Sequence, residues 1–267
     1  MSPSELQRLA RRQLADYDSR SPGTIFADGR LSLTIEDAYR LQIETARLRQ
    51  MRGEAIAGYK IGCVSQAVQR QLGVTQAVFG HVFESEIRPN EVILAESEFD
   101  HLGVEGEFAL TIARDVKDPE VLRDAPLRYV SEVFSVIELH NYVFRGPKPY
   151  AAELIANNAV HAGIVVSETR APAQGHEALD ISVSIDGEQL GVAAVDPFST
   201  LYELATILRG FGISLHQGDI VLAGSPLPLY RVSTGDRIEV RCPAVGEVGA
   251  TVGASSASGT LSQLPGA

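Results

Sequence analysis

The sequence contains few of the features that mark secreted, nucleic-acid-binding or membrane proteins. Its two cysteines, Cys63 and Cys242, cannot form a disulfide framework in a chain of 267 residues. The formal net charge is −11 and the basic residues form no stripe, which argues against nucleic acid and anionic membranes as partners. No apolar run is long enough for a membrane span, and the N-terminal segment lacks the apolar core of a signal peptide. We therefore expect a cytoplasmic protein.

The sequence also lacks an internal repeat and the glycine patterns of dinucleotide-binding and P-loop proteins. Its 45% apolar and 21% charged residues are typical of a globular domain. The predicted elements do not alternate regularly between strand and helix, which argues against a doubly wound parallel sheet. We therefore expect a mixed α+β fold in which strands dominate.

Two helices are predicted near the N-terminus. Apolar residues recur at helical spacing over residues 4–17, and a second helix begins at the N-cap Thr34 and ends near Gly53. From residue 55 onward short strand-like runs are separated by turns, and Asp186-Gly187 predicts a type I′ hairpin. These patterns divide the chain into an N-terminal helical subregion at 1–54, a strand-rich domain at 55–253 and a flexible tail at 254–267.

Two carboxylates in one predicted strand are the most informative feature of the chain. Glu105 and Glu107 are two residues apart in the apolar segment 104–112, so their side chains would point to one face. Glu138 follows a second apolar, strand-like run at 133–137. Like charges in apolar surroundings are costly unless a cation lies between them. Carboxylates without a nearby cysteine suit Mg²⁺ or Mn²⁺ better than Zn²⁺. A solvated strand face is the alternative explanation.

Several short segments, in order along the chain, resemble one known superfamily. They are 34–42, 58–62, 71–74, 104–107, 137–138, 155–159 and 218–225. Together they resemble the fumarylacetoacetate hydrolase superfamily, and within it the branch of 2-hydroxypentadienoate-type hydratases and 4-oxalocrotonate-type decarboxylases. The resemblance covers roughly residues 30–250. It implies a mixed β-roll flanked by helices, and a protein that assembles as a homo-oligomer.

The resemblance also implies roles for individual residues. Glu105, Glu107 and Glu138 match the metal ligands of the family, and Lys60 matches the active-site lysine of the branch. The glycines on either side of Lys60 would let the backbone approach a ligand closely. The positions that we expect to contact substrate are Lys60, Asn158, Gly224 and Ser225.

The sequence departs from the branch around the predicted metal site. Val78 stands where the hydratases often carry an aspartate that resembles a proton-transfer group. Asn157 and Asn141 replace frequent aspartates, and Gly103 replaces a frequent basic residue before the carboxylate pair. The predicted metal ligands are thus intact, whereas their surroundings have changed.

Three of the six histidines lie beside or within these motifs and are candidates for the missing proton transfer: His81, His140 and His161. We favour His161, because it lies in an altered motif, and then His140, because it would share a strand face with Glu138. Arg145 and Lys148 are either solvated loop residues or a clamp for a second substrate carboxylate.

The implied chemistry is that of a metal-dependent lyase. Mg²⁺ or Mn²⁺ held by three carboxylates would have up to three open positions, two of which a 2-oxo acid can fill. The cation would then stabilise the enolate that develops on the substrate. We expect a hydratase of a small 2-oxo or 2-hydroxy-dienoic acid. The alternatives are a 4-oxalocrotonate-type decarboxylase, a non-catalytic partner subunit of the same fold, and hydrolysis of a carbon–carbon bond.

Overall fold

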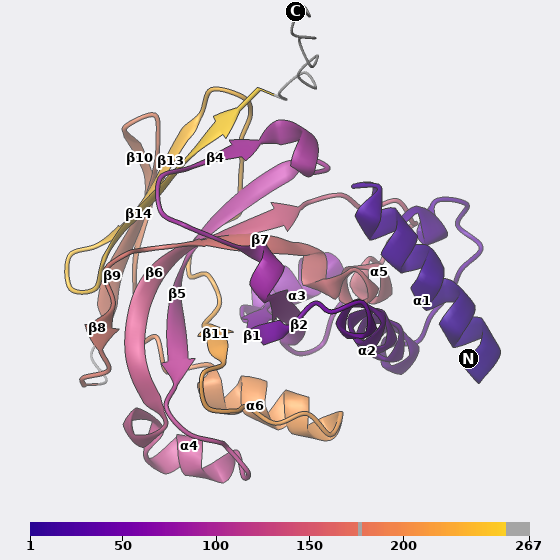
Figure 1. Cartoon of the computed structure of the whole chain (residues 1–267), viewed down its shortest axis with the longest axis horizontal. Helices are drawn as coiled ribbons and strands as arrows, with labels where there is room; N and C mark the ends of the chain where they lie inside the picture. The colour runs from indigo at the N-terminus through magenta and orange to yellow at the C-terminus, as the bar shows by residue number, and fades with distance from the viewer. Residues whose placement is uncertain (176–177, 255–267) are drawn as a thin grey trace, which may run out of the picture.

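The computed structural model describes residues 1–175 and 178–254 (Figure 1). The described residues form six α-helices: α1 (Pro3–Asp18), α2 (Ile35–Met51), α3 (Gln66–Leu72), α4 (Glu120–Asp124), α5 (Ala151–Ala156) and α6 (Leu201–Gly210). The strands are β1 (Ile56–Gly62), β2 (Val78–Phe83), β3 (Ile87–Arg88), β4 (Val92–Ala95), β5 (Leu102–Ile112), β6 (Val130–Asn141), β7 (His161–Val166), β8 (Ala171–Pro172), β9 (Leu179–Ile185), β10 (Glu188–Val195), β11 (Ile220–Leu222), β12 (Tyr230–Arg231), β13 (Arg237–Cys242) and β14 (Gly246–Gly253). Short 3₁₀ turns, among them η2 (Glu84–Glu86) and η5 (Asn158–Val160), connect some of these elements.

The two N-terminal helices begin where the sequence supplies caps. The Ser2 hydroxyl accepts a hydrogen bond from the backbone N–H of Glu5, and the Thr34 hydroxyl accepts one from that of Asp37. Helices α1 and α2 pack on each other, and α2 packs on α5 beside the sheet (Figure 1). Most of their buried apolar residues, among them Leu9, Tyr39 and Leu41, belong to the same core cluster as those of the strands. The helical region is therefore continuous with the core of the strand-rich domain.

The larger sheet is mixed and strongly curled. Its central order is β2-β1-β11-β5-β6-β7-β3, with β12 added to β5 and β8 added to β6. Strand β1 runs parallel to β11, and β3 runs parallel to β7, whereas the other pairs in this sheet are antiparallel. Strand β2, at one end of this order, approaches β7 near the other. A small apolar cluster from β2, β5, β6, β7 and β11 fills the inner face of the curl.

A glycine allows two neighbouring strands of this sheet, β1 and β11, to approach each other closely. Gly58 of β1 has φ +155°, and a Cβ added there would lie 1.9 Å from the carbonyl oxygen of Ile220. No other residue type can occupy that position without moving β11 away from β1. Strand β11 pairs with both β1 and β5 and so lies between these two strands, which are far apart in sequence.

The smaller sheet has the order β10-β9-β13-β14-β4 and packs on the outer side of β5 and β6. Gly106 marks the closest approach, because an added Cβ would lie 2.5 Å from Val183 and 3.1 Å from Val240. The neighbours of Gly106 in β5, Glu105 and Glu107, must therefore point to the opposite, inner face. The glycine between the two carboxylates is thus a packing residue.

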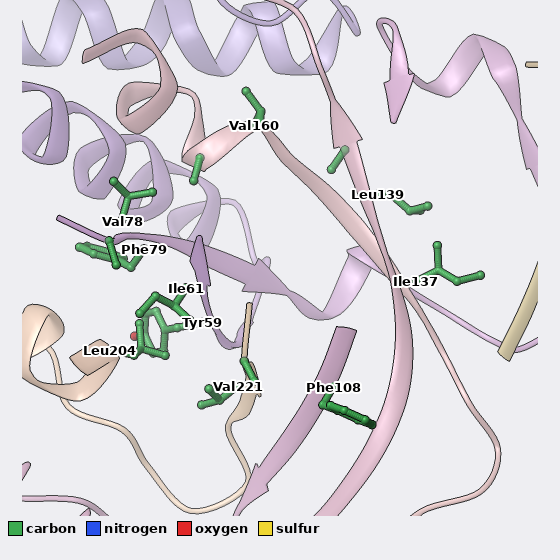
Figure 2. Close-up of a cluster of buried hydrophobic side chains, with 14 of the residues drawn as sticks. Tyr59, Ile61, Val78, Phe79, Phe108, Ile137, Leu139, Val160, Leu204 and Val221 are labelled. Carbon is green, nitrogen blue, oxygen red and sulfur yellow. The ribbon is translucent and has the colours of Figure 1, made fainter. Parts of the chain in front are cut away.

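The main hydrophobic core joins the larger sheet to the helices. Figure 2 shows part of this cluster, to which β1, β2, β5, β6, β11, α6 and η5 all contribute side chains. Phe79 stacks on Tyr39 of α2 with ring centroids 4.9 Å apart, and Phe211, just after α6, lies 4.6 Å from Tyr39. Burial of these large side chains from distant segments fixes how α2 and α6 sit on β1 and β2.

The predicted fold class is confirmed: strands dominate, the sheets are mixed and curled, and helices flank them. The hairpin of β9 and β10 turns at Asp186 and Gly187, whose φ angles of 52° and 79° fit the predicted type I′ turn. Of the predicted tail at 254–267, residues 255–267 lie outside the described residues. None of the described helices combines the length and apolar character needed to cross a bilayer.

Candidate metal centre and active site

The register of β5 and β6 brings two of the predicted ligands face to face. Glu105 is directly opposite Glu138 in the antiparallel pair, and Gly103 is opposite His140. Directly opposite side chains in such a pair are close enough to interact. Because the outer face of β5 is packed against the second sheet, these polar groups are confined to the inner face of the curl.

Glu138 is the centre of the cluster. Its Oε1 lies 3.2 Å from Lys60 Nζ and 2.6 Å from His161 Nδ1. Its Oε2 lies 3.5 Å from His140 Nε2, which is also 3.1 Å from Glu105 Oε2. Side chains from β1, β5, β6 and β7 thus converge on one carboxylate that is fully buried.

Lys60 fits among these carboxylates because its own strand leaves room. A Cβ added at Gly62 would lie 3.2 Å from Lys60 Nζ. Burial opposes the charged form of Lys60, but Glu138, Glu105 and Glu107 more than compensate and raise its pKa above the usual value. The lysine is therefore a cation in the protein without a bound metal.

Glu107 lies beside Glu138 and is held by a loop. Its Oε2 accepts a hydrogen bond of 3.0 Å from the backbone N–H of Gly224. Burial, together with the charges of Glu138 and Glu105, raises the pKa of Glu107 well above its usual value. Burial also acts to raise the pKa of Glu138, but Lys60, His140 and His161 hold it well below its usual value. Glu107 thus favours the protonated form, whereas Glu138 favours the ionised form.

The donor atoms fit a divalent cation. Glu105, Glu138 and His140 each place one ligand atom within 4.8 Å of the others. Oε2 of Glu138 is buried and has no hydrogen-bond partner among the described residues, which is costly for a carboxylate oxygen. Three carboxyl groups surround one lysine, so their full ionisation would leave an excess of negative charge that a divalent cation would neutralise. Carboxylate oxygens with an imidazole suit Mg²⁺, Mn²⁺ and related ions.

Comparison with known proteins agrees with the fold and the site. The family described as fumarylacetoacetate (FAA) hydrolase C-terminal matches residues 57–253. The chain belongs to this family. It is 29% identical over 222 residues to the 2-hydroxyhexa-2,4-dienoate hydratase of Comamonas testosteroni, covering 80% of this chain and 84% of that one. It is 25% identical over 225 residues to the 4-oxalocrotonate decarboxylase of Pseudomonas putida, covering 82% and 85%.

Among solved structures, the fold matches 4-oxalocrotonate decarboxylase from Pseudomonas putida G7, complexed with magnesium and adipate. The TM-score is 0.85 at 22% identity, over 94% of this chain and 98% of that one. The family and the hydratase and decarboxylase branch that the sequence motifs predicted are therefore confirmed.

The family motif around Asn158 forms a strained turn in this chain. Asn158, Ala159 and Val160 have φ angles of 56°, 51° and 55°, a run of three left-handed residues that are not glycine. The Asn158 side chain holds the turn against β2, because its Oδ1 accepts from the N–H of His81 and its Nδ2 donates to the carbonyl of His81. The turn leads into β7, whose first residue, His161, places its Nδ1 2.6 Å from Oε1 of Glu138.

Of the three histidines predicted near the motifs, His140 and His161 reach Glu138, whereas His81 points elsewhere. The ring of His81 lies among the aromatic rings of Tyr59, Phe79 and Phe83, with centroids 5.4 to 6.3 Å away. Burial lowers the pKa of His81 to about 4. This histidine is therefore a neutral member of an aromatic layer.

The departures from the family motifs have local explanations. Val78 is buried in β2, and one of its methyl groups would be 4.0 Å from a Cβ added at Gly62, near Lys60. No proton-transfer group can therefore act from that position. A Cβ added at Gly103 would lie 2.6 Å from Cδ2 of Leu229, so a basic residue there would require the Leu229 side chain to shift.

The predicted substrate-contact residues take part in interactions within the chain. The Ser225 hydroxyl lies 3.1 Å from the carbonyl oxygen of Gly106 and 3.0 Å from that of Leu227, and accepts from the N–H of Leu227. Arg145 donates to the carbonyl of Pro22 and to Asp100, an arrangement that ties together two loops. The backbone of Gly224 is the part of this loop that reaches the carboxylate cluster.

The motifs gave no sign of a second buried polar group behind His161. A cavity of about 50 Å³ lies between the N-terminal helices and β7, lined in part by Gln13, Gln42 and His161. Glu86, 4.0 Å from His161 Nε2, is paired with Arg49 of α2 at 2.8 Å. Nothing in the sequence around Glu86 distinguishes it from an exposed acid, because its partners come from α1 and α2.

Proposed function

We propose that the protein is a divalent-metal-dependent lyase that hydrates a small 2-oxo or 2-hydroxy-dienoic acid. The observation that carries this proposal is the convergence of Lys60, Glu105 and Glu138 on the inner face of the curled sheet. A chain related to hydratases has thus kept a charge cluster suited to a cation and an acidic substrate. We further propose that it acts in the cytoplasm as a homo-oligomer.

In this proposal Glu105, Glu107 and Glu138 hold Mg²⁺ or Mn²⁺. A bound cation would supply Lewis-acid chemistry, because it stabilises negative charge that develops on the oxygens of a 2-oxo acid. The unpartnered Oε2 of Glu138 and the raised pKa of Glu107 support this assignment. A nearby cation would give the carboxylate oxygen a partner and would lower the raised pKa by stabilising the ionised form.

Lys60 is the group that we propose to hold the substrate carboxylate and to move a proton. It is 3% exposed, so its ammonium group can interact strongly with a bound anion. His161 and His140 are the proposed partners in proton transfer, because each lies within 3.5 Å of an oxygen of Glu138. Hydration places a proton on one alkene carbon and hydroxide on the other, so both a donor and an acceptor of protons are required.

The loop carrying Gly224 and Ser225, and the turn at Asn158, complete the proposed substrate site. Gly224 has φ +86°, which directs its N–H to Glu107. Asn158 and Ser225 would act by fixing the backbone around the site, since their side chains bind backbone groups. Direct contact with substrate through a second lone pair or N–H is compatible with these bonds.

Decarboxylation of a 2-oxo-enedioate is the second candidate reaction. It is favoured by Val78, because an apolar side chain near Lys60 removes a proton-transfer group that hydratases of the branch often carry. Loss of carbon dioxide from an activated substrate needs no added water. A partner subunit without activity is the third candidate.

A product assay separates these possibilities. The purified protein is incubated with Mg²⁺ or Mn²⁺ and a panel of 2-oxo-dienoate monoacids and diacids. Incorporation of ¹⁸O from labelled water into the product supports the hydratase, whereas release of carbon dioxide from diacids supports the decarboxylase. Turnover of none of the panel, with metal bound, would favour the partner subunit and contradict the proposed activity.

A further inference from the structure

The two oxygens of the Glu138 carboxylate have different neighbours. Oε1 is engaged by Lys60 and His161, at 3.2 and 2.6 Å. Oε2 has no hydrogen-bond partner among the described residues, and it lies 3.5 Å from Nε2 of His140. The carboxylate is therefore oriented by one oxygen and leaves the other available to a ligand.

His140 Nε2 lies between the two carboxylates that face each other across β5 and β6. It is 3.1 Å from Glu105 Oε2 and 3.5 Å from Glu138 Oε2, and the residue is 2% exposed. An imidazole nitrogen donates a hydrogen bond in one tautomer and offers a lone pair in the other. A cation held by these two oxygens would have this nitrogen as its nearest additional donor.

We propose that His140 supplies a nitrogen ligand, through Nε2, to the metal centre. This inference rests on the proposed metal site and goes beyond it, because it changes the ligand set from carboxylates alone to carboxylates with one imidazole. Since a nitrogen bound to the metal cannot also accept a proton, it leaves Lys60 and His161 as the proton-transfer groups. Imidazole favours Mn²⁺ and later first-row ions relative to Mg²⁺, which prefers oxygen donors. The centre is therefore selective for Mn²⁺ or Co²⁺ over Mg²⁺.

The additional ligand also limits what else the cation holds. If three carboxylates and one imidazole held the cation, two of six octahedral positions would remain, which equals the number of donor oxygens in a chelating 2-oxo acid. A cation with carboxylate ligands alone would keep a third position for water. With His140 as a ligand, the water that hydrates the substrate would therefore come from the pocket and not from the metal.

The decisive measurement is the electron spin-echo envelope modulation of Mn²⁺ bound to the full-length protein. Wild-type protein is expected to show ¹⁴N modulation from a directly bound imidazole, replaced by the ¹⁵N pattern when histidine is ¹⁵N-labelled. His140→Phe should lose this modulation, while the exposed His216→Gln should keep it. His161→Gln should also keep it, because His161 bonds the other oxygen of Glu138.

Metal affinities, measured by calorimetry, give a second readout that needs no activity. His140→Phe is expected to weaken Mn²⁺ binding by about 10- to 100-fold and Mg²⁺ binding by much less, so that the selectivity for Mn²⁺ falls. Mn²⁺ bound to the variant should also carry one more water, seen as higher water-proton relaxivity.

Three results would overturn the proposal. These are ¹⁴N modulation that persists in His140→Phe, modulation lost only in His161→Gln, and labelled wild-type protein that binds Mn²⁺ without nitrogen coupling. The last result leaves the carboxylate metal site in place and needs no variant. Failure of wild-type protein to bind Mn²⁺ at one equivalent would instead contradict the proposed function itself.

Discussion

Glu105 and Glu138 face each other directly across β5 and β6, on the one side of β5 that the second sheet does not cover. Two opposed carboxylates in a sheet repel each other unless a cation neutralises them. Lys60 supplies one positive charge to this pair, and a divalent metal would supply the rest. The site therefore couples metal affinity, the lysine and the stability of the strand pair.

Removal of one ligand charge should weaken metal binding without unfolding the protein. Glu138→Gln and Glu105→Gln each keep the shape of the side chain, and each is expected to weaken Mg²⁺ or Mn²⁺ binding by about 100-fold or more. Calorimetric titration measures the change. Glu188→Gln, at an exposed position of β10, is the matched control and should bind metal like the wild type. Unchanged affinity in both ligand variants would show that the metal, if bound, lies elsewhere.

Lys60→Met should abolish turnover and uncover the repulsion between the carboxylates. The activity is expected to fall by about 100-fold or more, because the charge that holds the substrate or moves the proton is gone. Without metal, the free energy of unfolding should fall by about 3 kcal/mol, since a buried ion pair loses one partner. Added metal should restore much of this loss, as followed by thermal unfolding with and without chelator.

Lys117→Met is the control for that experiment, because Lys117 is exposed in the segment after β5 and has no assigned role in the site. It should change neither the activity nor the effect of the chelator. If Lys60→Met kept full activity, Lys60 would have only a structural role.

The sequence predicted the common face of Glu105 and Glu107, because the side-chain period of a strand is two. It could not predict that Glu138 lies opposite Glu105, since that register depends on how the segment with α4 returns the chain to the sheet. Likewise, Lys60 reaches Glu138 only because β11 lies between β1 and β5. The order of the motifs along the chain predicts that these residues share one site only because they share one in a known family.

Polar side chains were the harder part of the site to predict. That Asn158 and Ser225 contact substrate stays a prediction, and in the structure their side chains bond backbone groups of the chain itself. Sequence patterns do not separate these two uses, because both need a small polar side chain on a tight turn. His140 was placed on the face of Glu138 by strand period alone, whereas its approach to Glu105 required the register.

Gly106→Ala should damage the site through packing. The new methyl group would lie 2.5 Å from Val183, so β5 must move away from the second sheet or the valine must shift. We expect a loss of about 1 to 3 kcal/mol in the free energy of unfolding, together with weaker metal binding, because Glu105 and Glu107 move with the strand. Denaturant unfolding and calorimetry measure the two effects.

Gly210→Ala provides the comparison for that variant. Gly210 ends α6, has a negative φ and has no atoms within 4 Å of an added Cβ. Alanine there should leave stability unchanged or raise it by up to about 1 kcal/mol. If both variants behaved alike, the tight contact of Gly106 would not be what positions the carboxylates.

His81 should make the protein sensitive to acid. Its pKa is lowered by burial to about 4, whereas an exposed histidine in the unfolded chain has a pKa of about 6.5. Above pH 6.5 the ring is neutral in both states, so its contribution to stability is fully present. As the pH falls from 6.5 toward 4, the unfolded state binds the proton first and the folded state loses stability. Between pH 7 and pH 5 the loss due to this residue should be about 2 kcal/mol.

Replacing His81 with Leu should remove that part of the pH dependence, while His216→Gln, at an exposed site, should retain it. Denaturant unfolding at the two pH values tests this, and an equal pH dependence in His81→Leu and wild type would show that His81 is not the responsible group.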